Sequence, residues 1–186
     1  MSKKTLIALT VGSDLASQLL NGTALHQLAL DEALSVSKEI GAELIEVKSE
    51  NLLQTLKDKD FDLVVIHDEL RPLVSRAQIK KTIESLGDFD AIRPTMAFTE
   101  TIKSLDSEHR LNQTIDREKV RRISSPDVIR KSAIDFNGAI GTWTLPLING
   151  AKTSEIESEP QGIRVNNPEE LKMLEALLQL SNPAQK

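Results

Sequence analysis

The charged residues that follow the apolar run from Phe61 to Ile66 have the types and spacing that could do chemistry. The run ends in His67-Asp68, and Arg71 follows three residues after Asp68. An open α/β sheet binds its ligands at the carboxyl ends of its strands, so an Asp and an Arg at this place are suited to phosphate, ribose or a metal ion. The alternative is that Asp68 and Arg71 only pair with each other and order the loop.

Further short motifs follow in the second half of the chain. They are Thr99-Glu-Thr-Ile-Lys103, Thr114-Ile-Asp-Arg117, Ser124-Ser-Pro126 and Pro160 to Leu171. In order and spacing they resemble the motifs of the 2-C-methyl-D-erythritol 4-phosphate cytidylyltransferase family of isoprenoid synthesis. That family shows H-D-A-A-R-P, T-D-T-[IV]-K, D-R-x-x-L, Q-T-P-Q and N-[IL]-K-[VI]-T-x-P-E-D-L. The resemblance covers about residues 61–171, and the N-terminal third resembles the family only weakly.

The resemblance implies a three-layer α/β/α nucleotidyltransferase fold with a mostly parallel sheet. It implies nucleotide-side positions for Gly12, Ser13, Asp68 and Arg71, with Asp68 also a candidate ligand of Mg²⁺. The enzymes of the family transfer a cytidylyl group from CTP to methylerythritol phosphate. Mg²⁺ would therefore be the cofactor of an active enzyme, and an inactive relative would need none.

On the acceptor side the resemblance implies that Thr99 and Arg117 face the methylerythritol phosphate, often across a dimer interface. Arg164 aligns with the second catalytic lysine of the family, so it is a candidate for both catalysis and substrate binding. Arginine keeps the charge of lysine but not its compact shape. Each residue also has a structural alternative, namely a strand residue for Thr99, a hairpin ion pair for Arg117 and a surface charge for Arg164.

The loop after the first predicted strand lacks what a triphosphate needs. The family loop runs roughly A-A-G-x-G-x-R-x-G, with a lysine several residues on, whereas this chain keeps only Gly12 and Ser13 in register. No lysine occurs from Thr5 to Ser37, and Asp14 adds a negative charge. At about 4 Å, two like charges cost on the order of 1 to 4 kcal/mol. The G-G-x-x-R and T-D-[DE] motifs of the family are also missing.

From this pattern we expect a divergent member of the family with little or no CTP transfer, acting as a dimeric binding or regulatory protein. The dimer would be a homodimer or a heterodimer with an active paralogue. Two alternatives stay open. One is a working cytidylyltransferase with a rebuilt site, and the other is a protein that binds a sugar phosphate without chemistry.

Composition limits the other classes of function. The net charge of −5 disfavours general affinity for nucleic acid or membrane surfaces. Lys and Arg are nevertheless dense from Arg117 to Lys131, which predicts either a local anion site or a solvated face. The absence of cysteine excludes disulfides and thiol chemistry. The apolar segment near the start is too short for a signal peptide or a membrane span, so we expect a cytoplasmic protein.

Hydrophobic periodicity predicts alternating strands and helices in one domain over residues 1–186. We expect a β-hairpin around Asp106 to Arg110, within an arm at about residues 99–123 that crosses to a second subunit through residues 99–115. Residues 181–186 form a loose tail in this interpretation. The other predicted elements are strands at 5–11, 43–47, 61–66 and 91–98, and helices at 23–40, 52–57, 75–86, from Pro126, and from Pro168.

Overall fold

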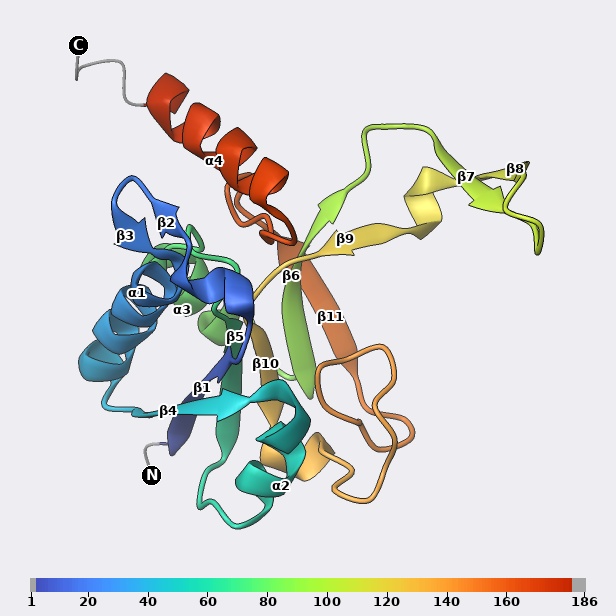
Figure 1. The fold of residues 1–186 in the computed structure, drawn as a ribbon. Helices are drawn as coiled ribbons and strands as arrows, with labels where there is room; N and C mark the ends of the chain where they lie inside the picture. The colour runs from blue at the N-terminus through green and yellow to red at the C-terminus, as the bar shows by residue number, and fades with distance from the viewer. Residues whose placement is uncertain (1–2, 182–186) are drawn as a thin grey trace.

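The computed structural model describes residues 3–181, which form a twisted sheet with helices on both faces (Figure 1). Over these residues the main sheet has seven strands in the order β11-β6-β10-β5-β1-β4, and β9 pairs with the end of β6. Strands β1, β4 and β5 are parallel, as are β6 and β11, whereas β10 runs antiparallel between β5 and β6. The predicted mainly parallel α/β fold is confirmed. The strands are β1 (Thr5–Val11), β4 (Glu43–Lys48), β5 (Leu63–Asp68), β6 (Ala91–Ala97), β9 (Arg121–Ile123), β10 (Asp127–Arg130) and β11 (Thr153–Glu157).

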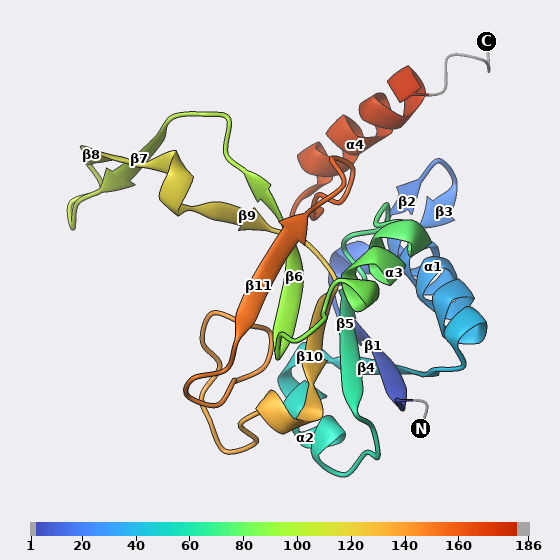
Figure 2. The ribbon, with the colours of Figure 1, turned by 180° about the vertical axis from the view of Figure 1, so that it is seen from behind.

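The central strands are buried on both faces, which explains their continuous apolar runs. Figure 2 shows α1 and α3 together on one face of the sheet. On that face Ile7 and Val65 pack with Val36 and Ile79, and on the other face Leu6 packs in the core with Leu52, Leu56 and Val64. The helices are α1 (Leu25–Ile40), α2 (Leu52–Lys57), α3 (Arg76–Glu84) and α4 (Pro168–Ser181).

Polar side chains and a glycine cap the helix ends. The Ser75 hydroxyl accepts a hydrogen bond from the Gln78 amide at 3.1 Å, so Ser75 caps α3. The Asn167 side chain accepts from the Glu170 amide at 2.9 Å, which caps α4. Each such cap stabilises its helix by about 1 kcal/mol. Gly41 ends α1 in the left-handed conformation, with φ at 67°.

The predicted hairpin forms an arm that projects from the body (Figure 1). Strands β7 (Ile102–Leu105) and β8 (Leu111–Ile115) pair as a separate two-stranded sheet. Their paired residues Leu105 and Leu111 are 54% and 75% exposed. An isolated hairpin is marginally stable in water, so an apolar pair at this place calls for a partner surface.

Two predictions at the local level were wrong. The helix expected from Pro126 is instead strand β10, entered through a cis Ser125–Pro126 bond. Val128 and Ile129 are fully buried between β5 and β6, so tertiary pairing overrides the proline signal. The helix predicted from residue 23 begins at Leu25 instead, because Thr23 and Ala24 form β3 (Thr23–Ala24), which pairs with β2 (Leu19–Leu20) in a small hairpin after the 3₁₀ helix η1 (Asp14–Ser17).

The loose tail predicted from Ser181 falls mainly on residues 182–186, which lie outside the described residues. Within residues 3–181, no helix has the length and apolar character needed to cross a membrane.

Candidate functional site

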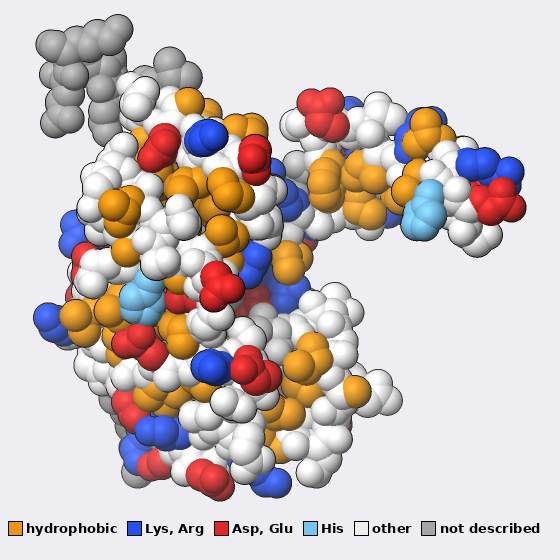
Figure 3. All heavy atoms as spheres, in the orientation of Figure 1, with side chains coloured by type: hydrophobic (Ala, Val, Ile, Leu, Met, Phe, Trp, Pro, Cys, Tyr) orange, Lys and Arg blue, Asp and Glu red, His pale blue; other side chains and the backbone are white. Residues whose placement is uncertain are grey.

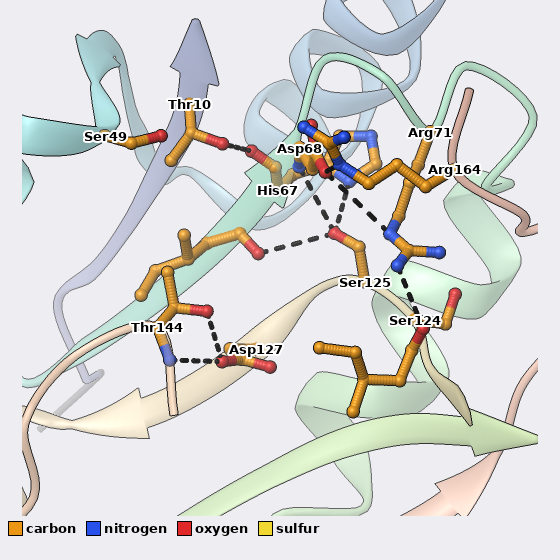
Figure 4. Close-up of a pocket in the computed structure, with 12 residues that line it drawn as sticks. Thr10, Ser49, His67, Asp68, Arg71, Ser124, Ser125, Asp127, Thr144 and Arg164 are labelled. Carbon is orange, nitrogen blue, oxygen red and sulfur yellow. Dashed lines mark hydrogen bonds and ion pairs between the residues drawn. The ribbon is translucent and has the colours of Figure 1, made fainter. Parts of the chain in front are cut away.

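A cavity of about 220 Å³ lies at the carboxyl ends of β1, β4 and β5 (Figure 4). Its wall includes three residues predicted from the sequence, Asp68, Arg71 and Arg164. Asp68 ends β5, and the arginines reach it from the following loop and from the segment before α4. The remaining wall is rich in hydroxyl groups from residues such as Thr10, Ser124, Ser125 and Thr144.

Both oxygens of the Asp68 carboxylate accept hydrogen bonds from the protein itself. One oxygen accepts from the Leu70 amide at 2.9 Å, and the other accepts from Nε of Arg164 at 2.7 Å. Arg71 Nε lies farther away, at 3.9 Å from the same oxygen. The predicted pairing of Asp68 with Arg71 is therefore secondary, and Arg164 is the principal partner.

Arg71 is buried and holds the backbone together at the cavity wall. Its guanidinium donates to the carbonyl oxygens of Gly162 at 2.6 Å and Ile123 at 2.9 Å. Burial lowers the pKa of Arg71 to about 10, with a smaller raising contribution from Asp68, so the side chain stays cationic at neutral pH. This residue links the loop after β5 to the base of the arm and to the segment before α4.

His67 and Ser125 join β5 to the turn before β10, a contact that the sequence did not predict. The Ser125 hydroxyl lies 2.8 Å from Nδ1 of His67 and accepts from the Asp68 amide at 3.3 Å (Figure 4). Burial lowers the pKa of His67 to about 4, so the ring is neutral at pH 7. Among the described residues, Nε2 of His67 has no hydrogen-bond partner.

Asp127 is the second carboxylate of the cavity wall; it is buried, and it too is paired with an arginine. It accepts from Arg93 Nε at 2.9 Å and Nη2 at 2.5 Å, and from the Thr144 hydroxyl at 2.6 Å. The Arg93 guanidinium stacks over Trp143 at 4.0 Å from the ring centroid. This network anchors Trp143 and Thr144, and the family's T-D-[DE] motif would fall near Gly141-Thr142-Trp143.

These carboxylates do not fit Mg²⁺. A magnesium site needs oxygen ligands that are free to coordinate. Both oxygens of Asp68 are bound by a backbone amide and by Arg164, and Asp127 is bound by Arg93 and Thr144. Across residues 3–181, no group of three His, Cys, Asp or Glu side chains is placed to hold a metal ion.

The carboxylate of Glu69, which is distant in the sequence, holds the loop after β1 in place. The Ser13 amide donates to Oε1 of Glu69 at 2.8 Å, and Oε2 of Glu69 lies 3.0 Å from Nδ1 of His26. Nε2 of His26 lies 3.2 Å from Glu46. Glu69 is only 3% exposed. One sequence difference could have revealed Glu69, because Glu69-Leu70 occupies the place of A-A in the family motif H-D-A-A-R-P.

Lys48 is a second residue that sequence reasoning missed. It pairs with Val11 at the end of β4, and its stem passes beside Gly12, where an added Cβ would lie 3.6 Å from Lys48 Cγ. Lys48 makes no ion pair with any residue the structure describes. The stem of a basic side chain from the neighbouring strand therefore passes beside the loop.

Thr99 and Arg117 meet each other but do not line the cavity. Nη1 of Arg117 donates to the Thr99 carbonyl at 2.8 Å, at the base of the arm. Lys103, also in the arm, donates to the Thr114 hydroxyl at 2.6 Å. Within one chain these predicted acceptor-side residues are therefore separate from Asp68, Arg71 and Arg164.

A mainly parallel sheet with helices on both faces, a cavity at its strand ends and a protruding hairpin defines a nucleotidyltransferase-like α/β protein. The fold is similar to that of 4-diphosphocytidyl-2C-methyl-D-erythritol synthase from Anaerococcus prevotii, with a TM-score of 0.77 and 19% identity over 96% of this chain and all of that one. The family profile of 2-C-methyl-D-erythritol 4-phosphate cytidylyltransferase matches residues 41–179. This chain belongs to that family.

Two relatives by sequence match part of this chain. The 2-C-methyl-D-erythritol 4-phosphate cytidylyltransferase of Caldanaerobacter subterraneus is 30% identical over 130 residues, which cover 65% of this chain and 57% of the relative. The bifunctional enzyme IspD/IspF of Nitrobacter winogradskyi is 30% identical over 141 residues, covering 68% of this chain and 34% of the relative. The chain thus matches little more than half of the first and about a third of the second. The family match begins at Gly41, beyond the loop and α1.

Proposed function

We propose that this chain is a divergent cytidylyltransferase-family protein with little or no CTP transfer, acting as a dimeric binding or regulatory protein. The observation that carries the proposal is the hydrogen bond from the Ser13 amide to Glu69. Triphosphates are held by backbone amides of glycine-rich loops. Here the amide donates to a carboxylate of the same chain, and Asp14 adds a further negative charge to the loop.

The cavity also supports the loss of nucleotide binding. Its volume of about 220 Å³ is below the roughly 300–1,000 Å³ of ordinary small-molecule sites. The two acidic side chains in its wall, Asp68 and Asp127, are bound by Arg164 and Arg93. Removing one electrostatic donor from an active site commonly costs about 3 to 4 kcal/mol of transition-state stabilisation. The loop lacks both an arginine and a lysine, so the deficit is larger than one such loss.

The arm supports the dimeric part of the proposal. Leu105 and Leu111 are exposed on a hairpin that does not pack on its own body (Figure 3). The same surface suits a second copy of this chain or an active paralogue. Thr99 and Arg117 at the base of the arm would then approach the cavity of the partner rather than their own.

The test is a turnover assay with CTP, methylerythritol phosphate and Mg²⁺. We expect no product above the blank, with the protein shown to be folded by circular dichroism. A kcat of roughly 1 s⁻¹ or more, which is ordinary for enzymes, would overturn the proposal.

One observation favours the alternative of an active cytidylyltransferase with a rebuilt site. The stem of Lys48 passes beside Gly12, and Arg71 and Arg164 place two cations at the cavity. Calorimetric titration with CTP separates the two functions. Micromolar binding that is lost in Lys48→Ala supports the enzyme, whereas no binding in either protein supports the interaction protein.

A further inference from the structure

The main sheet ends at two edge strands, β4 and β11, and β4 offers its outer edge for pairing. Within residues 3–181 the backbone of β4 bonds only to β1, so the N–H and C=O groups that point the other way have no partner in the chain. Such a row of unpaired groups is a template for a further strand. Figure 1 shows β4 at the end of the sheet away from the arm. We propose that β4 pairs antiparallel with β4 of a second copy of this chain.

The charges of the two edge strands differ in a way that favours β4. Strand β11 carries two glutamates and no basic residue, so its like charges protect that edge against a second copy. Strand β4 carries both signs, with Glu43, Glu46 and Lys48. The side chain of Glu46 is 47% exposed, and its ion-pair partner in the described residues is His26 alone. Since Lys48 has no such partner there, the charges of β4 are available to a second copy.

Two-fold symmetry restricts the register of such a pair. Identical antiparallel strands that lie side by side in one sheet are related by a two-fold axis perpendicular to the sheet, so the residues that face each other point to the same side. Side chains alternate between the two sides along a strand. Residues that face each other must therefore be an even number of positions apart, and the axis passes at a residue rather than between two residues.

One register alone matches the charges of β4. A centre at either glutamate or at Lys48 sets a charge against its own copy, which is destabilising. A centre at Leu44 or Ile45 sets no acid against a base. A centre at Val47 sets Glu46 of each copy opposite Lys48 of the other, so two ion pairs form on one side of the sheet. Val47 is 6% exposed, so the core of each copy continues up to the axis.

The pair is small, so the association is weak. It joins residues 46–48 of each copy, because the chain turns into the 3₁₀ helix η2 (Ser49–Asn51) beyond Lys48. Interfaces below about 1,200 Å² are typical of transient complexes. We therefore expect a dissociation constant on the order of 0.1 to 1 mM. Because the surface is separate from the arm, the pair would join arm dimers into larger assemblies only at such concentrations.

The test is sedimentation equilibrium of the Leu111→Asp chain, whose arm lacks its apolar contact, up to about 1 mM protein. We expect a reversible dimer. Glu46→Lys sets lysine against lysine and Lys48→Glu sets glutamate against glutamate, so each change should weaken association about tenfold or more. An equimolar mixture of these two variants should regain association, because every facing pair in the mixed dimer again joins a lysine to a glutamate.

Glu157→Lys is the matched control, because it makes the same change of charge on the other edge strand. It should leave the dissociation constant unchanged. Equal weakening by Glu157→Lys and Glu46→Lys would mean a diffuse effect of charge, and that result would overturn the pair. A Leu111→Asp chain that stays monomeric at about 1 mM would overturn it as well. A mixture that fails to regain association would exclude the register centred on Val47, and the proposal with it.

Discussion

The Glu69 carboxylate accepts a hydrogen bond from the Ser13 amide at 2.8 Å, across a separation of 56 residues. It thereby joins the end of β5 to the loop after β1. The second oxygen of Glu69 contacts His26 in the first turn of α1, so one side chain holds both ends of the segment 13–26. The loop that binds phosphates in nucleotidyltransferases is here fixed by an internal acid.

Replacing Glu69 by alanine should destabilise the fold by about 1 to 3 kcal/mol, because the partly buried Ser13 amide and His26 both lose their partner. Urea unfolding followed by circular dichroism measures this loss. The control is Glu46→Gln, which removes the exposed partner at the other nitrogen of His26 and should cost less than about 1 kcal/mol. Equal effects of the two changes would show that Glu69 does not hold the loop.

Much of this fold could be predicted because its signals are local. The apolar run ending at Asp68 gave a buried strand with charge at its carboxyl end, and the cap residues Ser75 and Asn167 marked real helix starts. The hairpin could also be predicted, because a run of polar residues around Asp106 separates two β-forming stretches. Each of these features depends on residues within a few positions of one another.

The missed features depend on pairing between distant segments. Nothing near Gly12 reveals that Lys48 passes beside it, because that contact follows from the register of β1 against β4. Asp127 likewise gave no sign of its pairing with Arg93, which lies on a neighbouring strand. Sequence patterns indicate which residues form an element, but sheet order decides which side chains meet.

Because His67 is buried and neutral, we predict that it lowers the free energy of unfolding in acid. Its pKa is lowered by burial from 6.5 to about 4, so between these pH values the unfolded chain binds a proton that the folded chain excludes. The free energy of unfolding therefore falls as the pH falls through this window. The stability that comes from keeping His67 neutral is fully present above pH 6.5. The difference between 6.5 and about 4 corresponds to about 3 kcal/mol at the acid end.

The measurement is urea unfolding at several pH values from 7 to 4, comparing the unaltered chain with His67→Gln. Other titrating groups are common to both proteins, so the difference between their pH slopes isolates His67. We expect a shallower slope in the variant, even if the variant is less stable at pH 7. If the free energy of unfolding depended on pH equally in both proteins, the result would contradict a neutral buried His67.

The Arg93–Asp127 pair should be costly to break from one side only. Arg93→Met leaves the Asp127 carboxylate buried with only Thr144 as a donor, and the loss of one partner of a buried pair commonly costs about 3 to 5 kcal/mol. The double variant Arg93→Met with Asp127→Leu removes both charges and should recover part of that loss. A double-mutant cycle on unfolding free energies measures the coupling, and simple additivity would contradict it.

We predict that the arm forms a dimer whose stability depends on the apolar side chain of Leu111. Leu111→Asp places a charge on the exposed pair formed with Leu105, so a dimer built through the arm should dissociate. Light scattering coupled to size-exclusion chromatography should show the mass of a dimer for the unaltered chain and that of a monomer for the variant. Ile140→Asp is the control, since Ile140 is 66% exposed but lies outside the arm, and it should leave the mass unchanged. A monomeric unaltered chain would exclude the homodimer, and mixing it with an active family member would then test the heterodimer.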